Sequence, residues 1–262
     1  MKILFIGDIV GSPGREAVKK LLPELKKEHG LDFVIANAEN AAGGSGITSR
    51  VTQELFESGV SVITSGDHIW KKSGVFEIID KDERILRPLN FPAGAPGRGA
   101  ALFTAKEGVK IGVVNLQGRV FMEGLLECPF KTGRSAIEAL IKETRIIIVD
   151  MHAEATSEKV ALGWYLEDLA SAVLGTHTHI QTADEKILPG GCAYITDVGM
   201  TGPYQSVIGR RVEDVLKKFI TAVPTRFEVA ADDIQLHGVV LDIDEKNGRA
   251  KSILRIQKKL LS

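Results

Sequence analysis

Short apolar runs alternate along this chain with longer stretches in which apolar residues recur every three or four positions. An unbroken run rich in β-branched residues is typical of a strand buried on both faces. We therefore predict strands over Lys2–Ile6, Phe33–Ala36, Val60–Thr64, Ile146–Val149 and Ala172–Leu174. The helical periodicity predicts helices over Pro13–Glu28, Val51–Ser58, Arg134–Glu143 and Ser157–Ala170. Since strands and helices alternate, we expect a mostly parallel sheet with helices packed outside it.

Two of the predicted helices carry start signals. Ser12 is a candidate N-cap before Pro13, because proline is favoured at the first helical position. Thr156 is a candidate N-cap shortly before Glu158, an acidic residue that suits the first turn of a helix. We therefore expect these two helices to begin at Pro13 and Ser157.

Two other regions have the pattern of antiparallel hairpins. Ala100–Thr104 and Val109–Leu116 flank a turn at Lys106-Glu107-Gly108, and Ile234–Asp242 and Ala250–Gln257 flank one at Glu245–Gly248. These hairpins predict a second, partly antiparallel sheet. Since no repeat and no long linker divides the chain, we expect one domain over residues 1–262.

Composition narrows the classes of function. The 33 Lys and Arg residues nearly balance the 34 Asp and Glu residues, so the chain lacks the charge of a protein that coats DNA, and a small substrate is favoured. Cys128 and Cys192 are the two cysteines and suggest neither a disulfide framework nor a thiolate zinc site. The sequence has no signal-peptide pattern and no apolar run of about 18 residues that could span a membrane. We therefore expect a cytoplasmic protein that does not bind membranes.

Polar residues follow each of the five predicted strands. They are Asp8, Glu39 with Asn40, Asp67 with His68, His152, and His177 with His179. The carboxyl ends of parallel strands form the crevice where such sheets bind ligands, so we expect these side chains at one rim. Each residue alone has a simpler explanation, such as a turn for Asp8 or a buried core histidine for His152. Together, carboxylates and imidazoles are the ligands that a pair of divalent transition-metal ions requires.

The segments that carry these residues resemble the motifs of the calcineurin-like metallophosphoesterases, and more narrowly of their bacterial YmdB-like branch. The resemblance runs in order through Gly7–Gly11, Asn37–Asn40, Ser65–His68, Leu116–Met122, Val149–Lys159, Gly175–His179 and Gly199–Pro203. It implies an α/β fold, a sandwich of two mixed β-sheets flanked by helices in the order α/β/β/α. It also implies a phosphodiesterase that acts on 2′,3′-cyclic or 3′,5′-cyclic nucleotides, in a chain that can form a homo-oligomer.

The resemblance also implies a role for each polar residue. One metal ion would be bound by Asp8, Asn40 and His179, and the second by Asp67, His152 and His177, with Glu39 bridging the two. Iron or manganese is expected, and zinc also suits these ligands. A hydroxide between the ions would attack the phosphodiester with His68 as general acid, or else His68 would orient a ligand. Arg119 is a candidate for substrate binding through a phosphate oxygen, or else a surface arginine.

Two positions depart from the pattern of these families. The broad superfamily usually has a histidine where this chain has Val10, so Asn40 would compensate at the first ion; the narrower branch shares this feature. The narrower branch usually has an asparagine where this chain has Asp67. Three carboxylates and a hydroxide cancel the charge of two divalent ions, whereas asparagine would leave one positive charge. We therefore expect tighter metal retention and weaker phosphate attraction than in a relative with asparagine.

Two other classes of function are open to this sequence. The turn over Gly7–Gly14 lies between a strand and a helix, where glycine-rich turns can bind phosphates without a metal. It lacks the Lys-Ser or Lys-Thr of a P-loop, and Asp8 would face the phosphate. A regulatory or scaffold protein that keeps the metal fold and acts through partners is the second alternative.

Overall fold

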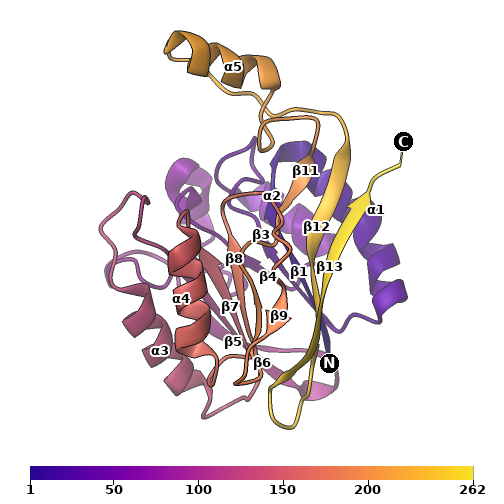
Figure 1. Cartoon of the computed structure of the whole chain (residues 1–262), viewed down its shortest axis with the longest axis vertical. Coiled ribbons are helices and arrows are strands. Elements are labelled where there is room, and N and C mark those ends of the chain that lie inside the picture. The colour runs from indigo at the N-terminus through magenta and orange to yellow at the C-terminus, as the bar shows by residue number, and fades with distance from the viewer. Residues whose placement is uncertain (262) are drawn as a thin grey trace.

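The computed structural model describes residues 1–261, with Glu107 described by its backbone alone. Two mixed β-sheets lie face to face, and helices cover their outer faces (Figure 1). The predicted α/β/β/α sandwich is therefore confirmed. Among the helices within residues 1–261, none combines the length and apolar character needed to cross a membrane.

The first sheet is built around parallel strands from the first third of the chain. Its order is β2 (Asp8–Ile9), β11 (Met200–Pro203), β12 (Ile234–Ile243), β1 (Lys2–Ile6), β3 (Phe33–Asn37) and β4 (Val62–Thr64), with β13 (Ala250–Lys259) paired to β12. Strands β1, β3 and β4 are parallel to one another, and β12 is antiparallel to β1, β11 and β13.

The second sheet takes the strands from the middle of the chain. Its order is β5 (Ala100–Thr104), β6 (Lys110–Gln117), β7 (Ile147–His152), β8 (Ala172–Thr176), β10 (Ala193–Ile195) and β9 (Lys186–Ile187). The four inner strands are parallel, and the edge strands β5 and β9 pair antiparallel to their neighbours.

The five predicted strands form, but the prediction of one mostly parallel sheet for them is wrong. Strands β1, β3 and β4 lie in the first sheet, whereas β7 and β8 lie in the second. Both predicted hairpins are confirmed, and each joins a different sheet: β5–β6 pairs with β7, and β12–β13 pairs with β1. An apolar run shows that a strand is buried on both faces, but it does not specify which sheet contains it.

The helices differ from their predicted boundaries mainly at their ends. They are α1 (Gly11–His29), α2 (Ser49–Glu57), α3 (Pro129–Leu140), α4 (Thr156–Leu166) and α5 (Val212–Thr221), with short 3₁₀ helices at Ile69–Lys71, Ser73–Glu77 and Lys106–Gly108. The N-caps predicted at Ser12 and Thr156 are wrong, because Val10 and Ala155 hold those positions and use no side-chain cap. Pro13 still fits the first turn of α1, where backbone N–H groups have no helical partner. Helix α5 was not predicted.

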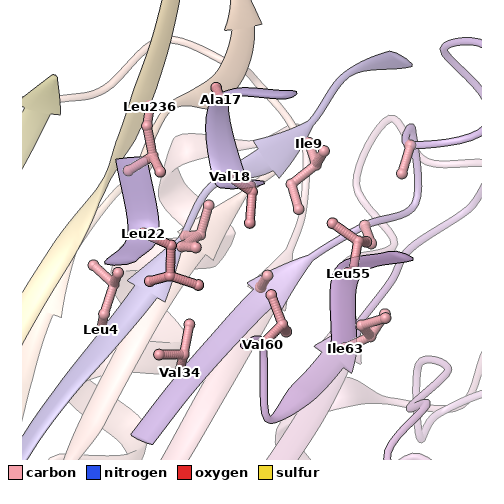
Figure 2. Close-up of a cluster of buried hydrophobic side chains, with 14 of the residues drawn as sticks. Leu4, Ile9, Ala17, Val18, Leu22, Val34, Leu55, Val60, Ile63 and Leu236 are labelled. Carbon is pink, nitrogen blue, oxygen red and sulfur yellow. The ribbon is translucent and has the colours of Figure 1, made fainter. Parts of the chain in front are cut away.

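Three clusters of apolar side chains explain why the strand sequences are unbroken runs of apolar residues. In β1, Leu4 packs toward α1 and α2 with Val18 and Leu55 (Figure 2), whereas Ile3 and Phe5 point into the space between the sheets. A third cluster packs α3 and α4 on the second sheet. Because successive side chains point to opposite faces, a strand buried on both faces needs an apolar residue at every position. The candidate site residues, which are polar, lie at or beyond the ends of such strands.

Candidate metal centre

Each predicted site residue lies at or just after the end of a strand. Asp8 begins β2 directly after β1, Glu39 and Asn40 follow β3, and Asp67 and His68 follow β4. In the second sheet, His152 is the last residue of β7, and His177 and His179 follow β8. His152 of the second sheet lies 3.2 Å from Glu39, which follows a strand of the first sheet. The site therefore lies between two sheet edges rather than in the crevice of one sheet.

Glu39, Asp67, His152 and His177 converge on one point. Each offers a ligand atom, and these four atoms all lie within 4.8 Å of one another. His152 Nε2 is central: it lies 3.2 Å from Glu39 Oε2, 3.2 Å from Asp67 Oδ1 and 3.0 Å from His177 Nδ1. Two imidazoles and two carboxylates in this arrangement have the donor atoms of a transition-metal site.

The electrostatics of this cluster favour a cation. Burial opposes a charged His152, but Glu39 and Asp67 outweigh it and raise the pKa of His152 well above its ordinary value. Burial likewise opposes a charged Glu39, yet His152 and His68 hold the pKa of Glu39 well below its ordinary value. Burial and the charge on His152 lower the pKa of His177 to about 4, so this imidazole is neutral and can donate a lone pair. The carboxylates of Glu39 and Asp67 thus favour a positive charge at this point, which a bound metal ion would supply.

Asp8, Asn40 and His179 form a second group beside the first. Asp8 is fully buried, and its Oδ1 has no hydrogen-bond partner among the described residues, although it lies 3.9 Å from His179 Nε2. Burial raises the pKa of Asp8. An orphaned, buried carboxylate oxygen is costly unless a cation compensates it, so this atom fits a metal ligand.

The orientation of the Asn40 side chain bears on its predicted role. Its Nδ2 lies 3.0 Å from Glu39 Oε1 and 3.3 Å from His179 Nε2, and its Oδ1 accepts a hydrogen bond of 2.7 Å from His68 Nδ1. The amide nitrogen therefore faces the other two candidate ligands. To bind a metal ion through its oxygen, Asn40 would have to rotate its amide by half a turn, which exchanges the positions of Oδ1 and Nδ2.

His68 lies at the edge of both groups and is partly exposed. Its backbone N–H donates to Glu39 Oε2 at 3.2 Å, and its Nε2 lies 3.6 Å from Asp67 Oδ2. A hydrogen bond to Glu39 is the largest influence on this imidazole, and it raises the pKa of His68 against the opposing effect of burial. A raised pKa favours the protonated ring, which is the form that a general acid needs.

Local backbone geometry brings these side chains together. A Cβ atom at Gly66 would overlap the His152 ring and Glu39 Oε2, so only glycine allows β4 to end this close to the cluster. His177 and His179 both have left-handed backbone conformations, with φ of 95° and 67°. Such conformations cost free energy in residues other than glycine and often occur at functional sites.

A cavity of about 410 Å³ opens onto these residues. Its lining residues include Glu39, Asn40, His68, His177 and His179. Arg210 lines it as well, whereas Arg119 is exposed and is not among the lining residues. The predicted substrate contact of Arg119 stays a prediction.

Comparison with known proteins identifies the family. The family model described as YmdB-like protein matches residues 4–256. The chain belongs to the YmdB-like family. It is 50% identical over 256 residues to the 2′,3′-cyclic-nucleotide 2′-phosphodiesterase of Bacillus subtilis strain 168, a match that covers 98% of this chain and 96% of the relative. The name of this relative agrees with the predicted class of phosphoric diester hydrolases.

Two crystal structures share this YmdB-like fold over almost the whole chain. A hypothetical protein from Thermus thermophilus is 41% identical with a TM-score of 0.90, and the alignment covers 99% of both chains. A novel phosphatase from Mycoplasma pneumoniae is 35% identical with a TM-score of 0.92, covering 99% of this chain and 93% of the other. The predicted resemblance and fold are thus confirmed together.

Sequence reasoning missed the buried residues that orient the candidate ligands of this chain. Thr176 Oγ1 donates a hydrogen bond of 2.7 Å to Asp150 Oδ1, so at 2.9 Å it accepts one from His152 Nδ1. This directs Nε2 of His152 toward the cluster, as partners of metal-ligating histidines do. Burial raises the pKa of Asp150 to about 6. A carboxylate inside the apolar run of β7 was the available signal.

A second missed pair supports the two histidines after β8. Asp197 Oδ2 accepts hydrogen bonds from Thr178 N at 3.0 Å and Thr178 Oγ1 at 2.6 Å, and Lys159 Nζ pairs with it at 2.8 Å. Lys159 and Asp197 are both almost completely buried. Because Thr178 lies between His177 and His179, this ion pair holds the strained segment that carries both candidate ligands.

Proposed function

We propose that this chain is a metal-dependent phosphodiesterase that hydrolyses 2′,3′-cyclic nucleotides, with 3′,5′-cyclic nucleotides as a second substrate class to be tested. The observation that carries the proposal is the convergence of Glu39, Asp67, His152 and His177 beside the orphaned oxygen of Asp8. The activity named for the Bacillus subtilis relative supports the choice of substrate.

The two carboxylate oxygens of Glu39 face different partners, which supports a bridging role. Oε1 lies beside Asn40, whereas Oε2 lies beside His152. Asp8, Asn40 and His179 would hold one ion, and Asp67, His152 and His177 would hold the other. When bound, a pair of divalent ions such as iron, manganese or zinc reduces the charge on the phosphate and supplies a nucleophile at neutral pH.

The chain's own residues would supply the remaining steps. Nδ1 of His68 is bonded to Asn40, so Nε2 is the nitrogen that can pass a proton to the leaving ribose oxygen. Glu154 lies 3.1 Å from His177 Nε2, and the Ile208 carbonyl accepts a hydrogen bond of 2.9 Å from His179 Nδ1. These contacts leave His177 Nδ1 and His179 Nε2 as the nitrogens that would hold the ions.

Arg210 is a candidate contact for the phosphate. Its Nη2 donates a hydrogen bond to the Gly44 carbonyl. Burial lowers the pKa of its guanidinium, and no carboxylate among the described residues raises it. The remaining N–H groups can bind a charged oxygen in the cavity. Arg210 therefore joins Arg119 as a candidate for substrate binding.

Comparison of two arginine variants distinguishes these candidates. We expect Arg210→Met to lower kcat/KM by about ten- to a hundredfold, because a hydrogen bond to a charged group is worth about 1.5–3 kcal/mol. Arg119→Met should have a smaller effect, since Arg119 is outside the cavity. Steady-state kinetics with 2′,3′-cyclic AMP measure both, with metal content as a control for folding. Equal losses, or a larger loss for Arg119→Met, would contradict this order.

Asp67→Asn tests the charge of the centre. Loss of one carboxylate should lower the metal affinity by about tenfold or more. A loss of this size occurs even when the substituted residue only forms a hydrogen bond to a metal ligand. Turnover at saturating metal should rise, because the phosphate then meets one more net positive charge. Metal titration and kcat measure the two effects, and Asp168→Asn, an exposed carboxylate outside the cavity, is the matched control. If neither quantity changes, Asp67 is not a ligand or its charge is immaterial.

A metal-reconstituted activity screen tests the proposed function as a whole. The metal-free protein is loaded with Mn, Fe or Zn and assayed with 2′,3′-cyclic AMP, 3′,5′-cyclic AMP and bis-p-nitrophenyl phosphate. Turnover that disappears in a His152→Asn variant purified in the same way supports the proposal, and no turnover with any metal overturns it. Complementation in cells by His68→Ala would favour the regulatory or scaffold alternative.

A further inference from the structure

Helix α5 stands away from the two sheets (Figure 1). Val215 is the one buried residue of this helix, whereas Leu216, Phe219 and Ile220 are 49%, 80% and 78% exposed. An amphipathic helix that leaves most of its apolar side chains in solvent does little to stabilise the fold. The exposed apolar side chains of this helix therefore need an explanation other than packing in the core.

The cavity at the candidate metal centre supplies one. Its lining combines polar residues, among them candidate ligands and His68, with five apolar residues. We call these five residues the apolar wall: Val207, Ile208, Val215, Phe219 and Phe227. Lys218 Nζ lies 5.0 Å from the centroid of the Phe227 ring, a cation–π contact that helps to fix this aromatic side chain.

The apolar wall and the metal centre are connected through the backbone. Ile208 contributes its side chain to the wall, and its carbonyl accepts the hydrogen bond from His179 Nδ1. Ile208 has a left-handed conformation, with φ of 45°. A group held at the metal centre is therefore within the same cavity as the aromatic side chains of α5 and the segment that follows it.

We propose that the apolar wall binds the base of a nucleotide whose phosphate lies at the metal centre. This inference rests on the proposed function and extends it from the reacting phosphodiester to substrate recognition. Every base has a flat π face that stacks on an aromatic side chain, and stacking tolerates any base. The five wall residues carry no polar side-chain group that could read a base edge, so the wall itself does not distinguish purines from pyrimidines.

A pair of substrates that share the reacting group tests the proposal. They are 2′,3′-cyclic AMP and methyl ribofuranoside 2′,3′-cyclic phosphate, which lacks the base. We expect the wild type to prefer the nucleotide, and Phe219→Ala to reduce the ratio of the two kcat/KM values about tenfold, mainly through KM. Phe219→Trp should keep the ratio. Ile220→Ala is the matched control, since Ile220 is equally exposed on α5 but does not line the cavity.

The outcomes separate this inference from the proposed function. If the wild type hydrolyses neither substrate, the proposed function fails. If it hydrolyses both and Phe219→Ala leaves the ratio unchanged, the base site is overturned while the phosphodiesterase stands. Light scattering on the same variants adds a second check: a changed oligomeric state with an unchanged ratio would assign α5 to contacts between copies of this chain, which also overturns the proposal.

Discussion

Replacement of His68 by glutamine is expected to lower kcat for 2′,3′-cyclic AMP by about 10²–10⁴-fold, the usual contribution of a general acid. The ribose oxygen needs a proton as it leaves, and His68 Nε2 is the nitrogen left free by the bond from Nδ1 to Asn40. The hydrogen bond to Glu39 raises the pKa of His68, which favours the protonated ring that a general acid needs.

A substrate with a better leaving group distinguishes this role from a positioning role. p-Nitrophenolate leaves without a proton, so the loss of a general acid should be much smaller with bis-p-nitrophenyl phosphate than with the cyclic nucleotide. His68 also contacts Glu39 and Asn40, and a positioning role would reduce both activities equally and lower the metal content. Kinetics with both substrates and metal analysis of the same preparation decide between the two roles.

The sequence predicts the site better than it predicts the sheets. His152 and Glu39 could be placed together because each comes after an apolar run, although the ends of β7 and β3 belong to different sheets and meet across the two sheet edges. Assignment of these runs to two sheets depends on pairings such as β1 with β12, whose residues lie far apart along the chain. An apolar run has the same pattern in either sheet, so the division was not predictable.

The residues that we propose to bind substrate or to position the candidate ligands were not predicted, for a related reason. Arg210 becomes notable only because it lies in the same cavity as His68, and Phe219 only because its helix stands away from the body yet lines that cavity. Neither has a neighbour in the sequence that marks it. Asp197 did carry a signal, an acid next to the apolar residues of β10, but its partner Lys159 lies on α4.

Replacement of Lys159 by methionine is expected to lower the free energy of unfolding by about 3–5 kcal/mol, because it leaves the charge of Asp197 buried without its partner. Lys159 Nζ lies 2.8 Å from Asp197 Oδ2, and both side chains are at most 1% exposed. Lys110 and Glu143 form an ion pair of the same length, but their side chains are 50% and 54% exposed. Lys110→Met is therefore the matched control, and it should leave stability unchanged. Urea unfolding of the metal-free proteins measures both variants.

A second substitution shows whether charge or packing causes this loss. Asn at position 197 carries no charge, and its single side-chain oxygen can keep either the hydrogen bond from Thr178 N or the one from Gly199 N, which bond to different oxygens of Asp197. The double variant Lys159→Met with Asp197→Asn should therefore regain part of the stability that Lys159→Met loses. No recovery would mean that the methylene groups of Lys159 stabilise the fold by packing. Metal affinity should follow the same order, since Thr178 holds His177 and His179 in place only while its own hydrogen bonds to position 197 persist.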